Sequence, residues 1–291
     1  ETIGRGTMGN VKKGTEKSTG RVVAIKEIVL EGSESDSDID DICKGITFMI
    51  SNTFPYFVQY YDYYIYEETL YIMLEYLPNR TLIDLIKAGT IGESACAIIS
   101  REILKALDCI HSKGFVHQNI QASQIFIGEN GEVKLSGPEK ATILSSKDYV
   151  LGFKPYWASP EIITRESFTC KMDIWSLGIT IIELLFGYPP FHDESSLRAL
   201  FLIVRTDPPR LEGNSFSDNF KDFVASCLTK ECAERPTAKQ LLNHPFILQA
   251  GDISCIKSLL LFHAEFKSIV IGSESDYSDY SDSDEYSDDF D

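Results

Sequence analysis

The sequence predicts an α+β protein with a strand-rich first third and a helical remainder. Residues 22–28 and 70–74 are rich in Val, Ile, Leu and Tyr and are bounded by turn-forming residues, which predicts strands, and residues 54–66 look the same. Farther along, apolar residues recur every three to five positions in CAIISREILKALDCIH, and residues 174–186 form a long apolar run that stops at Gly187. Both segments are therefore predicted helices.

Composition excludes several classes of protein. With 291 residues and 43% apolar composition, the chain can bury a large core, as one domain or as two lobes. Its net charge is −17, and such a surface is unsuited to nucleic acid. The apolar runs are too short to cross a bilayer, and no leader is expected. Seven cysteines occur singly, which favours reduced thiols in a cytoplasmic or nuclear setting and argues against zinc.

Changes in composition and hydrophobic pattern along the chain predict four segments. We expect a strand-rich lobe at 1–77, starting within a fragment because residue 1 is Glu, and a helical lobe at 78–250. Residues 251–271 predict a helix that docks on the large lobe or on another protein. Residues 272–291 are acidic and predicted to be disordered, either as a phosphorylation target or as a solvated terminus.

A glycine-rich stretch near the start indicates a nucleotide site. In IGRGTMGNV, Gly4, Gly6 and Gly9 have the G-x-G-x-x-G spacing, which lets a backbone approach a phosphate but also occurs in ordinary turns. The segment VVAIK follows and ends at Lys26, so that a glycine loop, a strand and a lysine occur in one order. At this point the sequence resembles a protein kinase.

The resemblance extends over residues 1–248 and is closest to the STE group, in the branch of the p21-activated and mammalian sterile-twenty-like kinases. It rests also on LYIMLEYL, YWASPEII, DIWSLGITIIELLFGYPPF and ERPTAKQLLNHPFI. It implies a two-lobed protein-kinase fold. The nucleotide-binding positions that it implies are Ile3, Gly4, Gly6, Gly9, Val11, Ala24, Lys26, Glu75 and Leu77.

The segment VHQNIQASQIFI is similar to the family's catalytic loop, H-R-D-[LI]-K-x-x-N. His117 is kept, whereas Gln118 replaces Arg, Asn119 replaces Asp, Gln121 replaces Lys and Gln124 replaces Asn. In the family, the Asp orients the substrate hydroxyl or accepts its proton. An amide is not a useful base, and general-base assistance contributes roughly 10²–10⁴-fold to rate. The resemblance therefore implies no catalytic residue at these positions.

The metal site differs from the family independently of the loop. VKLSGPEKA aligns with the strand that leads into D-F-G, which places Gly137 at the magnesium-binding Asp and Pro138 at the Phe. Gln124 could present a carbonyl, but Mg²⁺ normally takes at least one carboxylate beside the phosphates. We expect no productive metal binding.

The regulatory positions also differ. The family pairs its strand lysine with a helix Glu, and the alignment places Gly45 there, so Lys26 is expected to be unpaired unless Asp41 replaces that Glu. Tyr149 stands at the phosphorylated Thr, and the phosphate-reading Arg is Gln118. The segment GFKPYW is one residue longer than its counterpart. Control by a phosphorylated activation loop is therefore expected to be absent.

Structural positions of the family are kept. Glu161 and Arg235 match an ion pair that holds the activation segment, and Asp173 matches the helix residue that binds the catalytic-loop backbone, with Trp175 and Gly178 in phase. Such pairs brace a fold and do no chemistry.

Architecture without chemistry predicts a pseudokinase that acts as an allosteric partner or scaffold for an active protein kinase. The alternatives are a weak Ser/Thr kinase with atypical metal use and a degenerate fragment without function. ATP binding stays open: the glycines, Val11, Ala24 and Lys26 favour a metal-free ATP site, whereas Phe126, bulkier than the usual Leu under the adenine, favours a filled cavity. Protein partners are expected, and neither nucleic acid nor a membrane.

Overall fold

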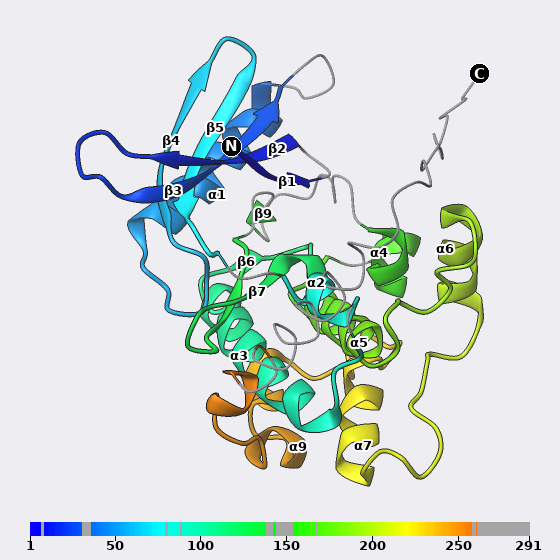
Figure 1. Cartoon of the computed structure of the whole chain (residues 1–291). Helices are drawn as coiled ribbons and strands as arrows, with labels where there is room; N and C mark the ends of the chain where they lie inside the picture. Colours follow the sequence, from blue (N-terminus) through cyan, green and yellow to red (C-terminus); the bar gives the residue numbers. More distant parts are fainter. Residues whose placement is uncertain are drawn as a thin grey trace, which may run out of the picture.

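The polypeptide folds into a small lobe built on a β-sheet and a larger helical lobe (Figure 1). The computed structural model describes residues 1–6, 9–30, 36–78, 81–87, 89–137, 142–143, 154–166, 168–257 and 260. The two lobes confirm the predicted α+β fold class. The predictions for Pro138, Tyr149 and the tail 272–291 lie outside the described residues.

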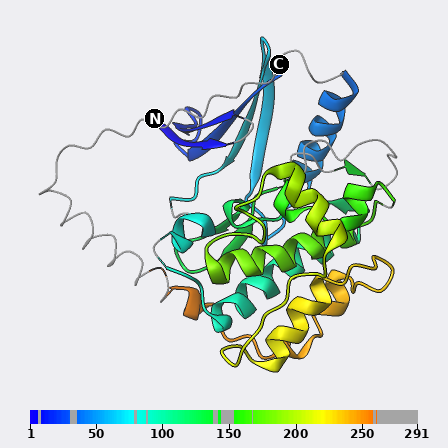
Figure 2. The ribbon, with the colours of Figure 1, turned by 90° about the vertical axis from the view of Figure 1, so that its right-hand side faces the viewer.

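The small lobe contains an antiparallel sheet with the strand order β1-β2-β3-β5-β4 among the described residues, and one helix packed beside β4. Its strands are rich in β-branched and aromatic residues, which favour the pleated backbone. Figure 2 shows the long β4–β5 hairpin edge-on, with the helix beside it. The elements are β1 (Thr2–Gly6), β2 (Gly9–Thr15), β3 (Val22–Val29), α1 (Asp36–Ser51), β4 (Tyr60–Tyr66) and β5 (Thr69–Glu75).

The predicted strand over residues 54–66 is too long at its start. Residues 54–57 form a turn, in which the Phe57 N–H donates to the Phe54 carbonyl at 3.2 Å, and β4 begins only at Tyr60. Pro55 has no N–H for a sheet ladder, which disfavours a regular strand there. The segment pairs with the large lobe instead: Val58 N–H donates to the Leu135 carbonyl at 2.9 Å. This short connection joins the two lobes.

The large lobe is mainly helical, with short strand pairs on the side that faces the small lobe (Figure 1). Its elements are α2 (Leu82–Ile86), α3 (Glu93–His111), β6 (Phe115–Val116), η1 (Ala122–Gln124), β7 (Ile125–Ile127), β8 (Val133–Leu135), β9 (Thr142–Ile143), η2 (Pro155–Trp157), α4 (Pro160–Thr164), α5 (Lys171–Phe186), α6 (Ser196–Arg205), α7 (Asp218–Cys227), α8 (Ala238–Leu241) and α9 (Pro245–Leu248).

Helix α5 is the centre of the large lobe. Every residue from Met172 to Leu185 is buried, and the helix is apolar nearly all round, as expected for a helix surrounded by protein. It ends at Gly187, whose φ of +89° suits a left-handed cap. Gly178 lets α7 approach closely, because a Cβ there would lie 2.8 Å from the Leu228 side chain. Both predicted helices, in α3 and α5, are confirmed.

The chain that follows α9 packs on α3. Arg101 donates to the carbonyls of Ala250 and Gly251 at 3.0 and 2.9 Å, and Ile256, in a helical turn at residues 254–257, is fully buried. The described part of the predicted segment 251–271 therefore docks on the large lobe. No helix within the described ranges is both long and apolar enough to cross a membrane.

Candidate functional site

A buried carboxylate on α5 holds the loop that resembles a catalytic loop. Asp173 is fully buried and accepts three hydrogen bonds of 2.8 Å: from the His117 N–H, from the Gln118 N–H and from Nε2 of His111 at the end of α3. A buried charge is costly unless it is fully hydrogen-bonded, and these donors meet that requirement. The predicted role of Asp173 is confirmed.

The loop backbone is held in an unusual conformation. Gln118 has φ = +66°, a left-handed value that few residues other than Gly adopt. Asp173 stabilises this conformation through the hydrogen bond from the Gln118 N–H. The backbone of the loop is therefore fixed at position 118, although the side chain there is an amide.

His117 is occupied with architecture. Its Nε2 lies 2.7 Å from the Ser136 carbonyl, which can only accept, so Nε2 carries the proton. Its Nδ1 then accepts from the Asn119 N–H at 3.2 Å. These two bonds fix the tautomer, and the ring is 1% exposed. The imidazole ties the loop to the segment after β8.

Two of the amides predicted at the chemical positions lie together, because Nε2 of Gln121 donates to Oδ1 of Asn119 at 2.6 Å. The main-chain carbonyl of Gln124 accepts from the Ser136 N–H at 2.7 Å, next to Gly137 in the chain. Gln118 and Asn119 also line a pocket with three polar residues that sequence reasoning did not single out, Lys154, Ser159 and Ser176. The sequence feature that could have drawn attention to Lys154 is the segment GFKPYW, which is one residue longer than its counterpart in the family. These amides can bind polar groups, but they cannot accept a proton.

Tyr60 fills the space that a side chain at position 137 would need. A Cβ on Gly137 would lie 2.5, 2.6 and 2.7 Å from Cε2, Oη and Cζ of the Tyr60 ring, and Tyr60 is 2% exposed. An Asp cannot be placed there unless the buried ring moves. The residues present therefore do not fit a magnesium ion: the carboxylate is missing, and its volume is occupied. Sequence reasoning missed Tyr60, because nothing local relates it to residue 137.

The glycine-rich positions lie on the antiparallel strands β1 and β2, whose pairing shifts register between Thr2 and Gly4. Gly4 pairs with Val11, Val11 with Lys26, and Lys26 with Ile72, so one row crosses β1, β2, β3 and β5. Gly9 has φ = +146°, and a Cβ on it would come within 1.6 Å of the Glu27 carbonyl oxygen. Packing against β3 alone therefore requires glycine at this position. The third glycine is no independent sign of a nucleotide.

The remaining positions that the resemblance assigns to a nucleotide lie on the sheet or just beyond its end. Ala24 is buried and pairs with Leu74, Leu77 is partly buried against the core, and Ile3 is 41% exposed. Phe126 is partly buried and packs against the same core.

The charged residues at these strands have protein partners. Nζ of Lys134 donates to both carboxylate oxygens of Glu75 at 2.5 and 2.7 Å, which connects β5 to β8 across the lobes. The expectation that Lys26 is unpaired is wrong, because Lys26 takes part in a polar or electrostatic contact, although Gly45 offers no carboxylate for it.

Glu183 on α5 is a buried carboxylate that sequence reasoning missed. Its Oε2 accepts from the Ala122 N–H at 3.0 Å and from Nε1 of Trp157 at 3.1 Å, which joins the loop end to η2. Burial raises the pKa of Glu183 to about 7, although both donors act in the opposite direction. The available signal was one acid inside the apolar run of α5, since such an acid must find partners.

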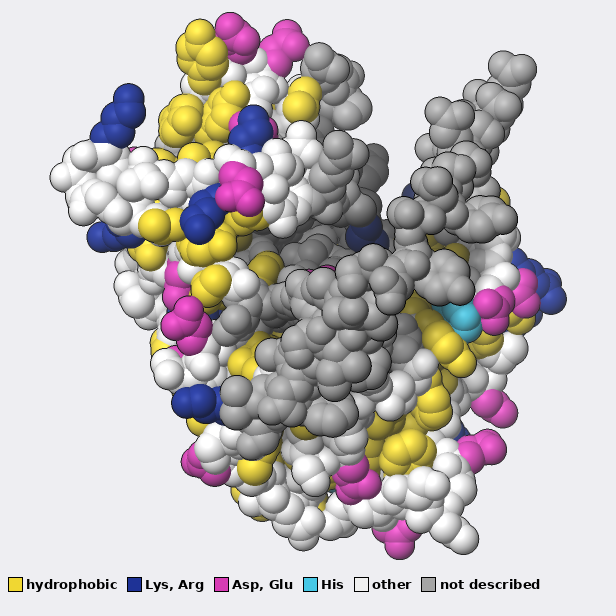
Figure 3. All heavy atoms as spheres, in the orientation of Figure 1, with side chains coloured by type: hydrophobic (Ala, Val, Ile, Leu, Met, Phe, Trp, Pro, Cys, Tyr) yellow, Lys and Arg dark blue, Asp and Glu magenta, His cyan; other side chains and the backbone are white. Residues whose placement is uncertain are grey.

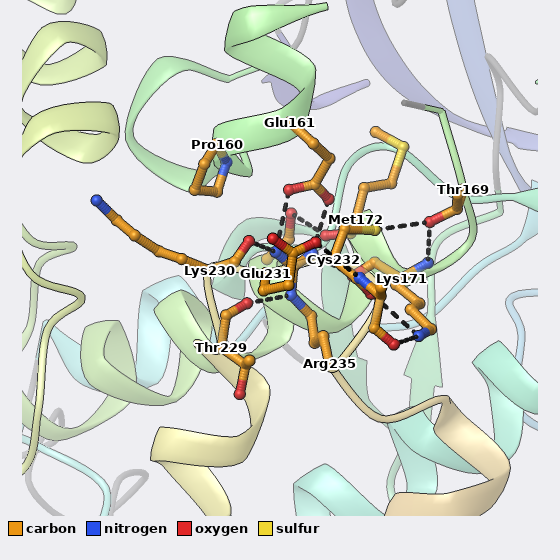
Figure 4. A network of polar contacts seen from close by, with 12 residues as sticks. Pro160, Glu161, Thr169, Lys171, Met172, Thr229, Lys230, Glu231, Cys232 and Arg235 are labelled. Carbon is orange, nitrogen blue, oxygen red and sulfur yellow. Dashed lines mark hydrogen bonds and ion pairs between the residues drawn. The ribbon is translucent and has the colours of Figure 1, made fainter. Parts of the chain in front are cut away.

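The predicted ion pair between Glu161 and Arg235 is present. Figure 4 shows the two side chains meeting between α4 and the start of α5. Arg235 is fully buried and binds both oxygens of Glu161, at 2.7 and 3.0 Å, and also donates to the carbonyls of Thr229 and Lys171 at 2.8 and 2.9 Å. Bidentate geometry with every donor engaged is what a buried pair needs.

Comparison with known proteins agrees with this geometry. Residues 1–247 match the model of the protein kinase domain family. This chain belongs to the protein kinase domain family. It is also similar to the serine/threonine-protein kinase dst1 of Dictyostelium discoideum, with 38% identity over 266 residues. The match covers 89% of this chain and 36% of dst1, so this chain spans about a third of the length of that relative.

We predict that Glu183→Gln removes a pH dependence from the kinase domain. The folded pKa of about 7 lies above the ordinary 4.5, so the folded state keeps a proton that the unfolded state loses. Stability is then full below about pH 4.5 and falls as pH rises to about 7, by up to ~3 kcal/mol. Gln keeps an acceptor and has no proton to lose. In urea unfolding, the free energy of unfolding of the variant should rise relative to that of the wild type from pH 4.5 to 8. A difference that stays constant with pH contradicts the prediction.

We predict that Gly137 and Tyr60 are energetically coupled. Gly137→Ala adds only a Cβ, and its overlap with the buried ring should cost about 1–3 kcal/mol. Tyr60→Leu should also destabilise the kinase domain through lost packing. Because Leu vacates the contested space, the double variant should be at least ~1 kcal/mol more stable than additivity gives. Denaturant unfolding of the four proteins measures the coupling, and strict additivity shows that the ring yields freely.

Proposed function

We propose that this kinase domain is a pseudokinase that acts as an allosteric partner or scaffold for an active protein kinase. The observation that carries the proposal is the packing of Tyr60 against Gly137, at the position where the resemblance places the metal-binding Asp. A kinase that still bound magnesium weakly at this position would need the space beside Gly137 to be open. Here a buried aromatic ring fills it.

The loop geometry supports the same proposal. Asn119 stands at the position of the base, and its Oδ1 already accepts a hydrogen bond from Gln121. Asp173 and His117 nevertheless keep the loop in one fixed shape. A surface that is rigid but lacks an acid or a base can recognise a partner, whereas it cannot assist proton transfer.

A nucleotide without magnesium fits the proposal as a structural ligand. The row of Val11, Lys26 and Ile72 and the buried Ala24 keep the strand framework of a nucleotide site. The alternative of a weak Ser/Thr kinase with atypical metal use would need a carboxylate from elsewhere. Within the described parts of the chain, no group of three or more His, Cys, Asp or Glu residues is placed to hold a metal ion.

We predict that ATP, if it stabilises the domain, does so equally with and without Mg²⁺, and that no phosphate is transferred. A ligand that binds only the native state adds RT ln(1 + [L]/Kd) to stability, about 2.7 kcal/mol at a hundredfold excess over Kd. The measurement is a thermal-shift titration of purified protein with ATP, with or without Mg²⁺, beside transfer to a generic basic protein. An active Ser/Thr kinase is the positive control. A magnesium-dependent shift accompanied by transfer would establish the weak-kinase alternative.

We predict that the domain binds a protein kinase and raises its activity. The tagged full chain is used for affinity purification from its own cells, and each recovered kinase is then purified and assayed with and without the domain. A tagged unrelated kinase domain is the control for non-specific capture. Recovery of no kinase, or of kinases whose rates do not change on addition of the domain, contradicts the partner role while leaving the absence of catalysis untouched.

A further inference from the structure

Helix α6 presents a face that nothing in the described part of the chain covers. Ala199 and Ile203 point inward and are buried, whereas Leu197 is 82% exposed and Phe201 is 52% exposed. Leu197, Phe201 and Arg205 recur at every fourth residue, so they lie on one side of the helix. Two large apolar side chains in succession on an exposed face are unusual for a helix whose other side is already packed.

This face is also cationic. The guanidinium carbons of Arg198 and Arg205 lie 5.5 and 5.7 Å from the centre of the Phe201 ring, within cation–π range. Neither arginine forms an ion pair with any other described residue. In Figure 3, basic side chains lie at the right-hand edge, where Figure 1 places α6, with acidic side chains beside them.

Several other cations of the domain bind acids or main-chain carbonyls, and others each lie over a separate aromatic ring, namely Lys13, Arg21, Lys105 and Lys113. Lys12 pairs with Glu27, Lys134 with Glu75, and Arg235 with Glu161. Lys171 and Lys230 donate to main-chain carbonyls. Two arginines held on one exposed aromatic ring therefore form a surface of a different kind: planar forks for carboxylates, beside apolar side chains that can pack against aromatic rings.

The complementary chemistry is present in the same chain. Residues 273–291 carry nine acids and no Lys or Arg, and their aromatic residues Tyr277, Tyr280, Tyr286 and Phe290 are set among these acids. The 30 residues from 260 to 290 span up to ~100 Å when extended. A globular unit of this size has a radius of gyration of only about 18 Å. The segment can therefore reach α6, at a local concentration in the millimolar range.

We propose that the face of α6 formed by Leu197, Arg198, Phe201 and Arg205 binds the acidic, aromatic-containing segment 273–291 of the same chain. The carboxylates engage the two guanidinium groups, and the aromatic rings pack on Leu197 and Phe201. The contact occupies a surface beside η2 and α4, with which α6 packs. It does not depend on whether the domain transfers phosphate, so its failure and that of the proposed function are distinguishable.

The test uses the full chain with the photoreactive residue p-benzoylphenylalanine in place of Phe290. Irradiation of a dilute equal mixture of light and ¹⁵N-labelled protein is followed by mass spectrometry of the cross-linked peptides. We expect adducts on residues 196–205, with both linked peptides carrying the same isotope. Raising the salt from 0.1 to 1 M should reduce the yield at least about fivefold, because the screening length falls from about 10 to 3 Å.

Charge variants decide whether the arginines carry the contact. Arg198→Glu/Arg205→Glu should lower the yield at least about tenfold, which corresponds to ~1.4 kcal/mol. Thermal unfolding shows whether charge reversal disturbs folding. If it does, Arg198→Gln/Arg205→Gln, which removes the two charges without reversing them, is used instead. Lys87→Glu/Lys239→Glu alters the net charge equally outside α6 and should leave the yield within about twofold. Adducts elsewhere, no adducts, or adducts that survive removal of the arginine charges overturn the proposal. Mixed-isotope adducts overturn it in favour of a second copy.

Discussion

The buried carboxylate of Asp173 is the constraint on which the rest of the large lobe depends. It accepts hydrogen bonds from the end of α3 and from two consecutive backbone N–H groups of the loop after β6, so that α3, α5 and the loop meet at one point. A charge with no exposed surface must keep these donors or cost several kcal/mol. The loop therefore has one favourable shape, which includes the left-handed conformation of Gln118.

The same principle extends along α5. Glu183, in the last turn of α5, accepts hydrogen bonds from the loop end and from Trp157. Glu161 binds Arg235 near the start of the same helix. In each case a buried acid on or beside a central apolar helix fixes a segment that has little regular structure of its own. None of these contacts involves the positions at which the family does its chemistry. The architecture can therefore persist when the chemical groups have changed.

The side-chain volume that is missing at Gly137 is taken up by a neighbouring residue. Gly137 would leave a void if nothing else moved into it, and the Tyr60 ring lies against it. Interiors are close-packed, so a residue that loses its side chain is stable only when a neighbour takes up the space. Gly9 shows a different cause for a glycine, since a main-chain carbonyl excludes any side chain there. The same residue type thus marks a filled site at Gly137 and close packing against the main chain of β3 at Gly9.

The sequence by itself determined the fold class and the helices α3 and α5, because periodicity is a local signal that needs no knowledge of neighbours. The pairing of Glu161 with Arg235 was implied by the resemblance to protein kinases. The resemblance also identified the loop in which Gln118, Asn119 and Gln121 replace charged residues of the family. Only the tertiary structure decided that Tyr60 fills the space at Gly137, that Glu183 joins two segments, that Lys26 has a contact and that β4 starts at Tyr60. Those features depend on which side chains meet across distant parts of the chain, and side-chain volume and partner geometry are not written in sequence spacing.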